Sequence, residues 1–370
     1  MAEYDIHHIA RHLDLPGDFL GAEPYGSGHI NDTYRATYRE AGKTVYYILQ
    51  RINHDVFKQP IPLMDNVDRI TRHQREKLQA GGVTDLDRRA LRVIPATDGL
   101  SYYQDDDGNI WRAYVFITRA QTYDFLEDPQ QAFQAGKAFG GFQLQLSDLP
   151  GERLVETIPN FHHTPKRFET FAAAVAEDRM NRARLARPEI AFAMAQEAMT
   201  RHLIDCYKDG RMPERITHND TKINNVMLDD ETGEGICIID LDTTMPGLIP
   251  YDFGDMVRTY TSPTEEDERD LSKIHIEMAL FKNLAEGYLA SAHTFLTEAE
   301  RENLVFGGKL MTFENGIRFL TDFLQGDVYY KIHREGHNLD RCRTQFKLVA
   351  LIAEQEAALN EIVAAWSPDV

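Results

Sequence analysis

The feature that most restricts the fold is a predicted hairpin inside an otherwise helical part of the chain. Its strands cover residues 225–228 and 236–239, and the sequence Asp-Asp-Glu-Thr-Gly at 229–233 makes the turn between them. The stretch ITHNDTKINNVMLDD, at 216–230, leads into the first strand with many polar residues. Such density fits either a helix-capping turn or a loop that carries chemistry. Its place at the head of a hairpin favours the loop.

Three residues of this loop, His218, Asp220 and Asn225, form the pattern His-x-Asp-x₄-Asn. In a kinase catalytic loop, this spacing holds a base for the acceptor hydroxyl and an amide ligand for Mg²⁺. Asp240 ends the second strand, so its carboxylate can reach the same point as the Asn225 amide, although a strand-terminating turn residue would look the same. These residues therefore predict a proton-accepting Asp beside a cation site.

Three further acidic residues, Asp242, Asp252 and Asp255, follow the hairpin. Asp252 and Asp255 stand just after a turn rich in Gly and Pro. They could accept N–H bonds from the catalytic loop or cap the next helix. We expect all three to support the site structurally.

The hydrophobic pattern changes along the chain. Residues 1–117 hold most of the β-branched and aromatic runs, which predict an antiparallel meander crossed by one helix. The predicted strands are 33–38, 44–52, 90–94, 100–104 and 110–117, and the helix is 61–78. Residues 118–370 are mainly helical. Helices are predicted there at 129–146, 165–184, 188–208, 265–292, 297–325 and 339–365.

The stretch YGSGHIN, at 25–31, stands at a predicted strand turn. Gly26, Ser27 and Gly28 would let the backbone come close to a ligand, and N–H groups in such a turn can face phosphate oxygens. Local sequence alone favours a tight hairpin without a ligand. The stretch is a nucleotide-binding candidate only because the same chain also contains the predicted catalytic loop.

Composition narrows the class of protein. A chain of 370 residues is too long for one ordinary core, so we expect two or three subdomains. A net charge of −19 and the lack of a basic run argue against nucleic acid as a partner. Three dispersed cysteines, an N-terminus without an apolar leader and the lack of long apolar runs predict a cytoplasmic protein without a membrane partner. We expect a monomer.

Taken together, the motifs resemble the aminoglycoside phosphotransferase-like branch of the protein-kinase fold. The patterns His-x-Asp-x₄-Asn, Ile-Asp-x-Asp and Asp-x-x-Asp occur in the order and spacing of that superfamily. Closer still, several segments are similar to the N-acetylhexosamine 1-kinases: YGSGHINDT, ILQRIN, HNDTKINNVMLD, IDLDTTMPG, YDFGDMVRT and RFLTDFLQGDVYYKI. The resemblance implies an α+β, protein-kinase-like fold with two lobes: a small N-terminal lobe, residues 1–117, with an antiparallel sheet, and a larger, mainly helical C-terminal lobe, residues 118–370.

The resemblance also implies an activity. The chain would use ATP and Mg²⁺ to phosphorylate the anomeric hydroxyl of an N-acetylhexosamine. Asp220 would be the base that faces the sugar hydroxyl, and Lys222 would neutralise the phosphate in transit. Asn225 and Asp240 would hold Mg²⁺.

The nucleotide and sugar contacts are assigned in the same way. The hinge beside adenine would be Phe116, Ile117 and Thr118, and the sugar contacts besides Asp220 would be His29, Arg318 and Tyr329. Protein kinases hold the phosphates with a Lys on the third strand, where this chain offers Gln50 or Arg51. Because Arg can bind phosphate through two N–H groups, we expect Arg51 to do so.

Other functions compete with this one. A protein kinase would need an activation segment, but only 11 residues separate Asp240 from Asp252. A non-catalytic pseudokinase would be expected to lose the base or a metal ligand, and both are present. The main alternative is a kinase of the same family for another acceptor, such as a different hexose, an amino alcohol or an aminoglycoside. The chemistry defines only the phosphate half of the site.

Overall fold

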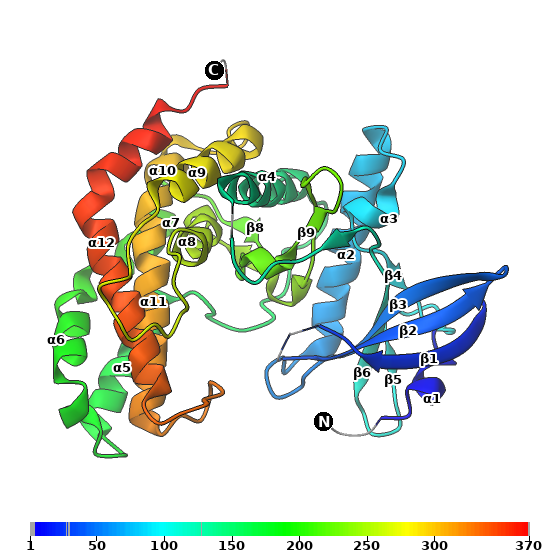
Figure 1. Ribbon diagram of the computed structural model, residues 1–370, viewed down its shortest axis with the longest axis horizontal. Helices are drawn as coiled ribbons and strands as arrows, with labels where there is room; N and C mark the ends of the chain where they lie inside the picture. The colour runs from blue at the N-terminus through cyan, green and yellow to red at the C-terminus, as the bar shows by residue number, and fades with distance from the viewer. Residues whose placement is uncertain (1–3, 27, 29, 127, 369–370) are drawn as a thin grey trace.

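The computed structural model describes residues 4–26, 28, 30–126 and 128–368. Figure 1 shows a twisted sheet at one end of the molecule and most of the helices at the other, with α2 and α4 between them. The predicted α+β arrangement with a small sheet-containing lobe and a larger helical lobe is confirmed. The exact boundary between residues 117 and 118 stays a prediction.

Within the described residues, a six-stranded antiparallel sheet forms the N-terminal lobe. Its order is β1-β2-β3-β6-β4, and β5 also pairs with β6. The strands are β1 Asp18–Pro24, β2 Asp32–Glu40, β3 Lys43–Arg51, β4 Val93–Ile94, β5 Tyr103–Gln104 and β6 Ile110–Val115. The β2-β3-β6 centre of the sheet corresponds to the three longest predicted runs.

The edges of the sheet differ from the prediction. β4 is shorter than the predicted strand 90–94 and ends before Pro95, which has no N–H to offer a neighbouring strand. β5 keeps only the end of the predicted strand 100–104. β1 was not predicted, because this mostly exposed edge strand mixes Gly, Ala and Pro with acidic residues.

The helix α2, Pro60–Ala80, covers the sheet on the side of the C-terminal lobe. It begins at a proline, whose missing N–H costs nothing in the first turn, and stops at Gly81. Its Met64, Val67 and Ile70 are buried in a core that residues of both lobes share. The predicted helix at 61–78 is therefore confirmed.

The C-terminal lobe is built from helices, as predicted. They are α4 Pro129–Leu146, α5 Thr164–Glu177, α6 Arg187–Ala195, α7 His202–Lys208, α8 Ile249–Tyr260, α9 Met278–Ala292, α10 Glu298–Glu302, α11 Leu304–Gln325 and α12 His337–Ala365. The short helices α1 Ile6–Ala10 and α3 Leu86–Arg89 belong to the N-terminal region. No helix in the described part of the chain is both long and apolar enough to cross a membrane.

Four predicted helices are shorter or broken. The helix expected at 297–325 divides at Asn303 into α10 and α11. The helix expected at 165–184 ends at Glu177, because Asp178 adopts a left-handed conformation with φ of +38°. The helix expected at 188–208 divides into α6, a 3₁₀ turn and α7. The helix expected at 265–292 begins only at Met278, because the preceding acidic segment bonds to its own side chains, as where Asp270 accepts from the Ser272 N–H.

Short strands lie among these helices and frame the catalytic loop. β9 Val226–Asp229 and β10 Gly235–Ile238 form the predicted hairpin, and β7 Ala120–Gln121 pairs with β9. β8 Arg215–Thr217 pairs with β11 Met245–Gly247. The loop between β8 and β9 is therefore held at both ends by strand pairing.

A close crossing between α8 and α11 positions two sides of the site. A Cβ atom added at Gly254 would lie 2.3 Å from the Gly307 carbonyl oxygen, and one added at Gly307 would lie 2.1 Å from the Pro250 carbonyl oxygen. Only glycine allows the two backbones to approach this closely. The crossing brings α8, which supports the catalytic loop, against α11, which carries Arg318.

Candidate active site

The catalytic loop, residues 218–225, rests on carboxylates of α8. Asp252 accepts the backbone N–H groups of His218 at 2.8 Å and Asn219 at 2.7 Å, and Asp255 accepts that of Thr221 at 3.0 Å. Both carboxylates are at most 3% exposed. Buried N–H groups need such partners, so these bonds determine the path of the loop.

Asn219 gives the loop its sharp bend. Its φ is +65°, a left-handed conformation that Asn tolerates better than most residues. Its side-chain amide donates to the carbonyl oxygens of Thr217 and Thr243, at 3.1 and 2.9 Å. The bend directs the next residue, Asp220, out of the buried scaffold, and its side chain is 30% exposed.

The Asp220 carboxylate lies between two side chains of the same loop. The Lys222 ammonium is 3.0 Å from one carboxylate oxygen, and the Asn225 amide N–H donates to the other at 3.3 Å. Burial acts to raise the pKa of Asp220, but the charge and hydrogen bond of Lys222, together with other nearby positive charges such as Arg258, lower it below the usual value. Asp220 is therefore ionised at neutral pH.

Asp240 lies beside Asn225, because the Ile239 N–H donates to the Asn225 carbonyl oxygen at 2.9 Å. Burial, together with the carboxylates of Asp242 and Asp220, raises the pKa of Asp240 to about 6. A cation would relieve this repulsion, and a carboxylate plus an amide oxygen suit Mg²⁺.

No group of three or more His, Cys, Asp or Glu side chains suited to a metal ion is present among the described residues. Asn225 and Asp240 by themselves offer a metal ion one amide oxygen and one carboxylate.

A buried ion pair joins the two lobes next to Asp240. Arg112 of β6 pairs with Asp242 of the C-terminal lobe, and the two side chains are 1% and 2% exposed. Asn31 also donates to Asp242, at 2.7 Å. On the same side of the sheet, Arg112 donates twice to the Gln50 side-chain oxygen, at 2.9 and 2.6 Å.

The side chain of Arg51 does not join this group. It lies on the opposite face of β3, where it donates to Asp32 at 2.7 Å and its guanidinium lies over the Tyr4 ring. Neighbouring residues of a strand point to opposite faces, so Gln50 and Arg51 cannot both face the C-terminal lobe. The geometry disagrees with the prediction for Arg51, and the buried cation on the inner face is Arg112. A lone Arg within the apolar strand IWRAYV was the signal that could have found it.

The predicted nucleotide residues lie around one end of the sheet. Gly26 is left-handed with φ of +83°. The preceding residue, Tyr25, packs edge-on against Phe116 with ring centroids 5.5 Å apart, so the glycine-rich stretch meets the predicted hinge. Ile117 is buried, and the Thr118 carbonyl oxygen accepts from Arg88. Gly28 is exposed, whereas Ser27 and His29 lie outside the described residues.

Two of the predicted sugar residues, Arg318 and Tyr329, come from α11 and the segment after it. Arg318 of α11 lies over the rings of Phe161 and Tyr330, at 5.5 and 5.7 Å from their centroids. Tyr329 is 62% exposed and packs against Tyr330. Its backbone is held by Asp322, which accepts the N–H groups of residues 328–330.

Sequence reasoning missed the residues that connect these parts. Gln143 donates to Asp252, and Asp322 shapes the segment that holds Tyr329. His162 contacts both Glu314 of α11 and the Asn219 carbonyl oxygen. No local motif marks Gln143 or His162, because each acts on a partner distant in sequence. Asp322 lies within the segment RFLTDFLQGDVYYKI and acts on residues six to eight positions away, but its role was not predicted.

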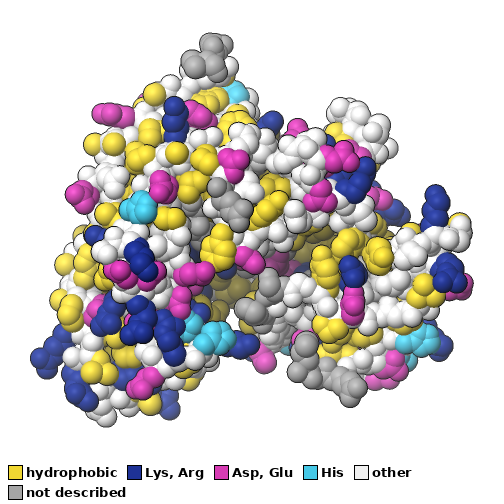
Figure 2. Space-filling view, viewed as in Figure 1, with side chains coloured by type: hydrophobic (Ala, Val, Ile, Leu, Met, Phe, Trp, Pro, Cys, Tyr) yellow, Lys and Arg dark blue, Asp and Glu magenta, His cyan; other side chains and the backbone are white. Residues whose placement is uncertain are grey.

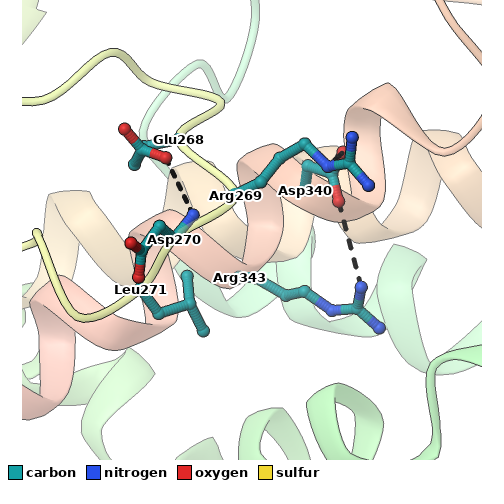
Figure 3. Close-up of a pocket in the computed structure, with 6 residues that line it drawn as sticks. All are labelled: Glu268, Arg269, Asp270, Leu271, Asp340 and Arg343. Carbon is teal, nitrogen blue, oxygen red and sulfur yellow. Dashed lines mark hydrogen bonds and ion pairs between the residues drawn. The ribbon is translucent and has the colours of Figure 1, made fainter.

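The surface between the two lobes is hollowed, with hydrophobic side chains inside the recess (Figure 2). A separate surface pocket, shown in Figure 3, lies where the loop before α9 meets α12. It is lined by Glu268, Arg269, Asp270, Leu271, Asp340 and Arg343. None of the predicted site residues lines this second pocket, and its charges pair with one another or with nearby residues. We assign it no role.

Comparison with known proteins identifies the family to which this arrangement belongs. A family model described as the phosphotransferase enzyme family matches residues 21–271. An aminoglycoside phosphotransferase from Alicyclobacillus acidocaldarius subsp. acidocaldarius DSM 446 is similar in structure, with a TM-score of 0.58, 13% identity, and 99% of this chain and 98% of that chain covered.

Two further structures have the same fold. A choline kinase from Cryptosporidium parvum Iowa II has a TM-score of 0.52, 13% identity, and 94% of this chain and 92% of that chain covered. A spectinomycin phosphotransferase, in complex with ADP and spectinomycin, has a TM-score of 0.51, 15% identity and 94% of both chains covered. These likenesses confirm the kinase-like fold. Because the family model covers more than half of the chain, the protein belongs to the phosphotransferase enzyme family.

Proposed function

We propose that this protein is an ATP-dependent kinase that phosphorylates the anomeric hydroxyl of an N-acetylhexosamine. Family membership supports phosphoryl transfer to a small molecule. The choice of an N-acetylhexosamine as the acceptor rests on the motif resemblance and on the charge of the acceptor side. We also propose that the lobes divide near residue 117.

The catalytic loop suits phosphoryl transfer. Asp220 is ionised and exposed enough to meet a hydroxyl group. It would accept the proton while the acceptor oxygen forms a bond to the γ-phosphorus and the bond to the ADP oxygen breaks. Asp220 raises the pKa of Lys222, so the ammonium keeps its proton and can contact the transferred phosphoryl group.

Asn225 and Asp240 are the residues that would hold Mg²⁺. When bound, this ion would spread the negative charge of the phosphates. The raised pKa of Asp240 supports a cation there, since Arg112 relieves only part of the effect of burial and of the repulsion from Asp242 and Asp220.

ATP is the proposed donor. The ADP in the spectinomycin phosphotransferase complex supports an adenine nucleotide. The contact between Tyr25 and Phe116 supports adenine binding at the hinge, because it brings the glycine-rich stretch to residues 116–118. Arg112 is our candidate for a cation near the phosphates, in place of Arg51.

The observation that carries the acceptor class is a pair of arginines. Burial lowers the pKa of Arg167, and the nearby positive charge of Arg318 lowers it further. Among the described residues, neither forms an ion pair with a carboxylate within 4.0 Å. A cationic acceptor, such as an amino alcohol or an aminoglycoside, would be repelled there, whereas a neutral sugar with an amide carbonyl could accept N–H bonds from Arg318.

A turnover screen tests this function. The purified protein is mixed with ATP, MgCl₂ and one of six acceptors: N-acetylglucosamine, N-acetylgalactosamine, glucose, glucosamine, choline or kanamycin. ADP release gives the rate, and ³¹P and ¹H NMR of the product locate the phosphate. We expect the two N-acetylhexosamines to react fastest and to carry an anomeric phosphate.

The matched control is the 1-O-methyl glycoside of N-acetylglucosamine, which keeps the sugar but blocks the anomeric oxygen. It should not react. Turnover of choline or kanamycin without turnover of either N-acetylhexosamine would contradict the proposed acceptor and leave the family assignment in place.

A further inference from the structure

Two buried histidines have hydrogen bonds to the backbone of the catalytic loop. His162 is 8% exposed and His218 is fully buried. The first comes from the segment before α5, and the second belongs to the loop itself. Their hydrogen-bond partners differ, and the difference determines how many protons each ring carries.

The His162 ring has an acceptor at each nitrogen. Its Nε2 lies 3.0 Å from the Asn219 carbonyl oxygen, which can only accept, so Nε2 carries a proton. Its Nδ1 lies 2.8 Å from a Glu314 carboxylate oxygen, and the other Glu314 oxygen accepts from the Thr164 hydroxyl at 2.6 Å. Burial opposes ionisation of Glu314, but His162 and then Arg318 lower its pKa below the usual value. The Thr164 hydrogen bond and the positive charge of Arg318 stabilise the carboxylate independently of His162, which favours a second proton on Nδ1.

The His218 ring has a donor on one side. Its Nε2 donates to the Ile239 carbonyl oxygen at 3.0 Å, while its Nδ1 lies 3.3 Å from the Asp220 backbone N–H and accepts from it. One nitrogen therefore has a proton and the other does not. His218 is neutral, and it provides an internal comparison for His162.

His162 also joins the catalytic loop to the acceptor side. Glu314 stands one helical turn before Arg318 on α11, and Phe161, next to His162, packs under the Arg318 guanidinium. At the other end, the Asn219 carbonyl belongs to the peptide that leads into Asp220. The groups facing the ring are Glu314 from α11, the Tyr251 ring from α8, the neighbouring Phe161 ring and the Asn219 carbonyl.

We propose that His162 is a positioning residue. As a buried imidazolium bound to Glu314, it holds the Asn219–Asp220 peptide in a fixed position relative to Arg318 on α11. The inference rests on the proposed function only in taking Asp220 as the group that accepts the acceptor's proton. The imidazolium stabilises one orientation of this peptide, and misplacement of a base costs rate rather than nucleotide affinity.

The first test reads the protonation state of the wild-type protein. Histidines are labelled with ¹⁵N, and two-bond ¹H–¹⁵N spectra are recorded at neutral pH with ADP bound; the His162→Gln and His218→Gln spectra identify the two rings. We expect two protonated nitrogens for His162 and one for His218. An unprotonated nitrogen in the His162 ring would overturn the proposal.

The second test separates positioning from folding. His162→Gln and Glu314→Gln are compared with His73→Gln, a control whose ring also lies near a carbonyl oxygen and a carboxylate, at the contact of α2 with the end of α4. We expect both site variants to lose about 10- to 100-fold in kcat with N-acetylglucosamine, with an unchanged Kd for ADP, while the control stays within about twofold.

A kcat within about twofold of the wild type in both site variants, with ADP still bound, would overturn the proposal. If one variant fails to bind ADP, the other variant and the wild-type spectra decide. Failure of the proposed function would look different, because the wild-type protein itself would then not phosphorylate an N-acetylhexosamine, whatever the state of His162.

Discussion

The phosphate half and the acceptor half of the site are built differently. The phosphate half takes its catalytic and metal-binding candidates from residues 218–242, and buried carboxylates of α8 hold the backbone that carries them. The acceptor half draws side chains from Phe161 to Tyr330, and one of its predicted contacts, Tyr329, is largely exposed. A backbone held by buried hydrogen bonds keeps one chemistry, while side chains on separate elements can change acceptor at little cost to the fold.

The largest expected effect tests the phosphate half. Asp220→Asn keeps the size of the side chain but removes the proton acceptor, so kcat should fall by about 10²- to 10⁴-fold. The Kd for ADP, measured by calorimetry, should stay the same, because Asp252 and Asp255 still hold the loop. An Asn variant with wild-type kcat would show that Asp220 is not the proton acceptor. It would also contradict the contrast between the phosphate half and the acceptor half.

The next test concerns the joint between the lobes. Arg112→Met would leave Asp242 buried without its cation, which typically costs about 3–5 kcal/mol of unfolding free energy. Urea denaturation measures this loss. The control is Arg35→Met, whose partner Glu23 is exposed, and which should cost about 1 kcal/mol or less. Equal losses in the two variants would mean that the ion pair does not support the phosphate half.

A third test addresses the acceptor half directly. Arg318→Met removes the positive charge while keeping much of the side-chain length. A lost hydrogen bond to a charged group should raise the KM for N-acetylglucosamine by about 10- to 100-fold. The KM for ATP should not change. Lys309→Met, on the same helix and paired with Glu356, is the matched control and should leave both KM values alone. A raised KM for ATP instead would place Arg318 in the phosphate half.

The smallest expected effect is at the exposed rim. Tyr329→Ala should raise the acceptor KM by about 2- to 10-fold, the worth of one aromatic contact, without changing kcat. Tyr329→Phe keeps the ring and should behave like the wild type if stacking is what matters. Steady-state kinetics with N-acetylglucosamine distinguishes these cases. A loss in kcat as large as that of Asp220→Asn would show that the two halves are not separable in the way proposed.

Much of the fold could be predicted from local patterns. The β2-β3-β6 centre, α2, α4 and the β9-β10 hairpin follow from alternating or helical hydrophobicity with Pro and Gly at the ends. The segment at 265–277 could not, because its charged residues read as a helix until their bonds to one another are known. Edge strands such as β1 could not be predicted either, since pairing with a neighbour rather than composition makes them strands.

The candidate site also contains some residues that the sequence could identify and others that it could not. Asp220, Lys222, Asn225 and Asp240 were found because they lie within 21 positions of one another in a motif whose spacing reports their chemistry. For the strand residue that faces the C-terminal lobe, the sequence favoured Arg51. The alternation of β3 instead turns Arg51 away and leaves the inner face to Gln50 and Arg112.

The sequence by itself determined the lobes, the catalytic loop and its order of acidic residues, because these depend on contacts between near neighbours in the chain. Only the tertiary structure decided which arginine is buried between the lobes, that Arg318 comes close enough to affect Arg167, and that His162 lies between Glu314 and the Asn219 carbonyl. Each of these depends on partners more than 50 residues apart, such as His162 and Asn219, which lie 57 positions apart in sequence. The charge state of a buried group is a property of its surroundings, and those are assembled only when the chain folds.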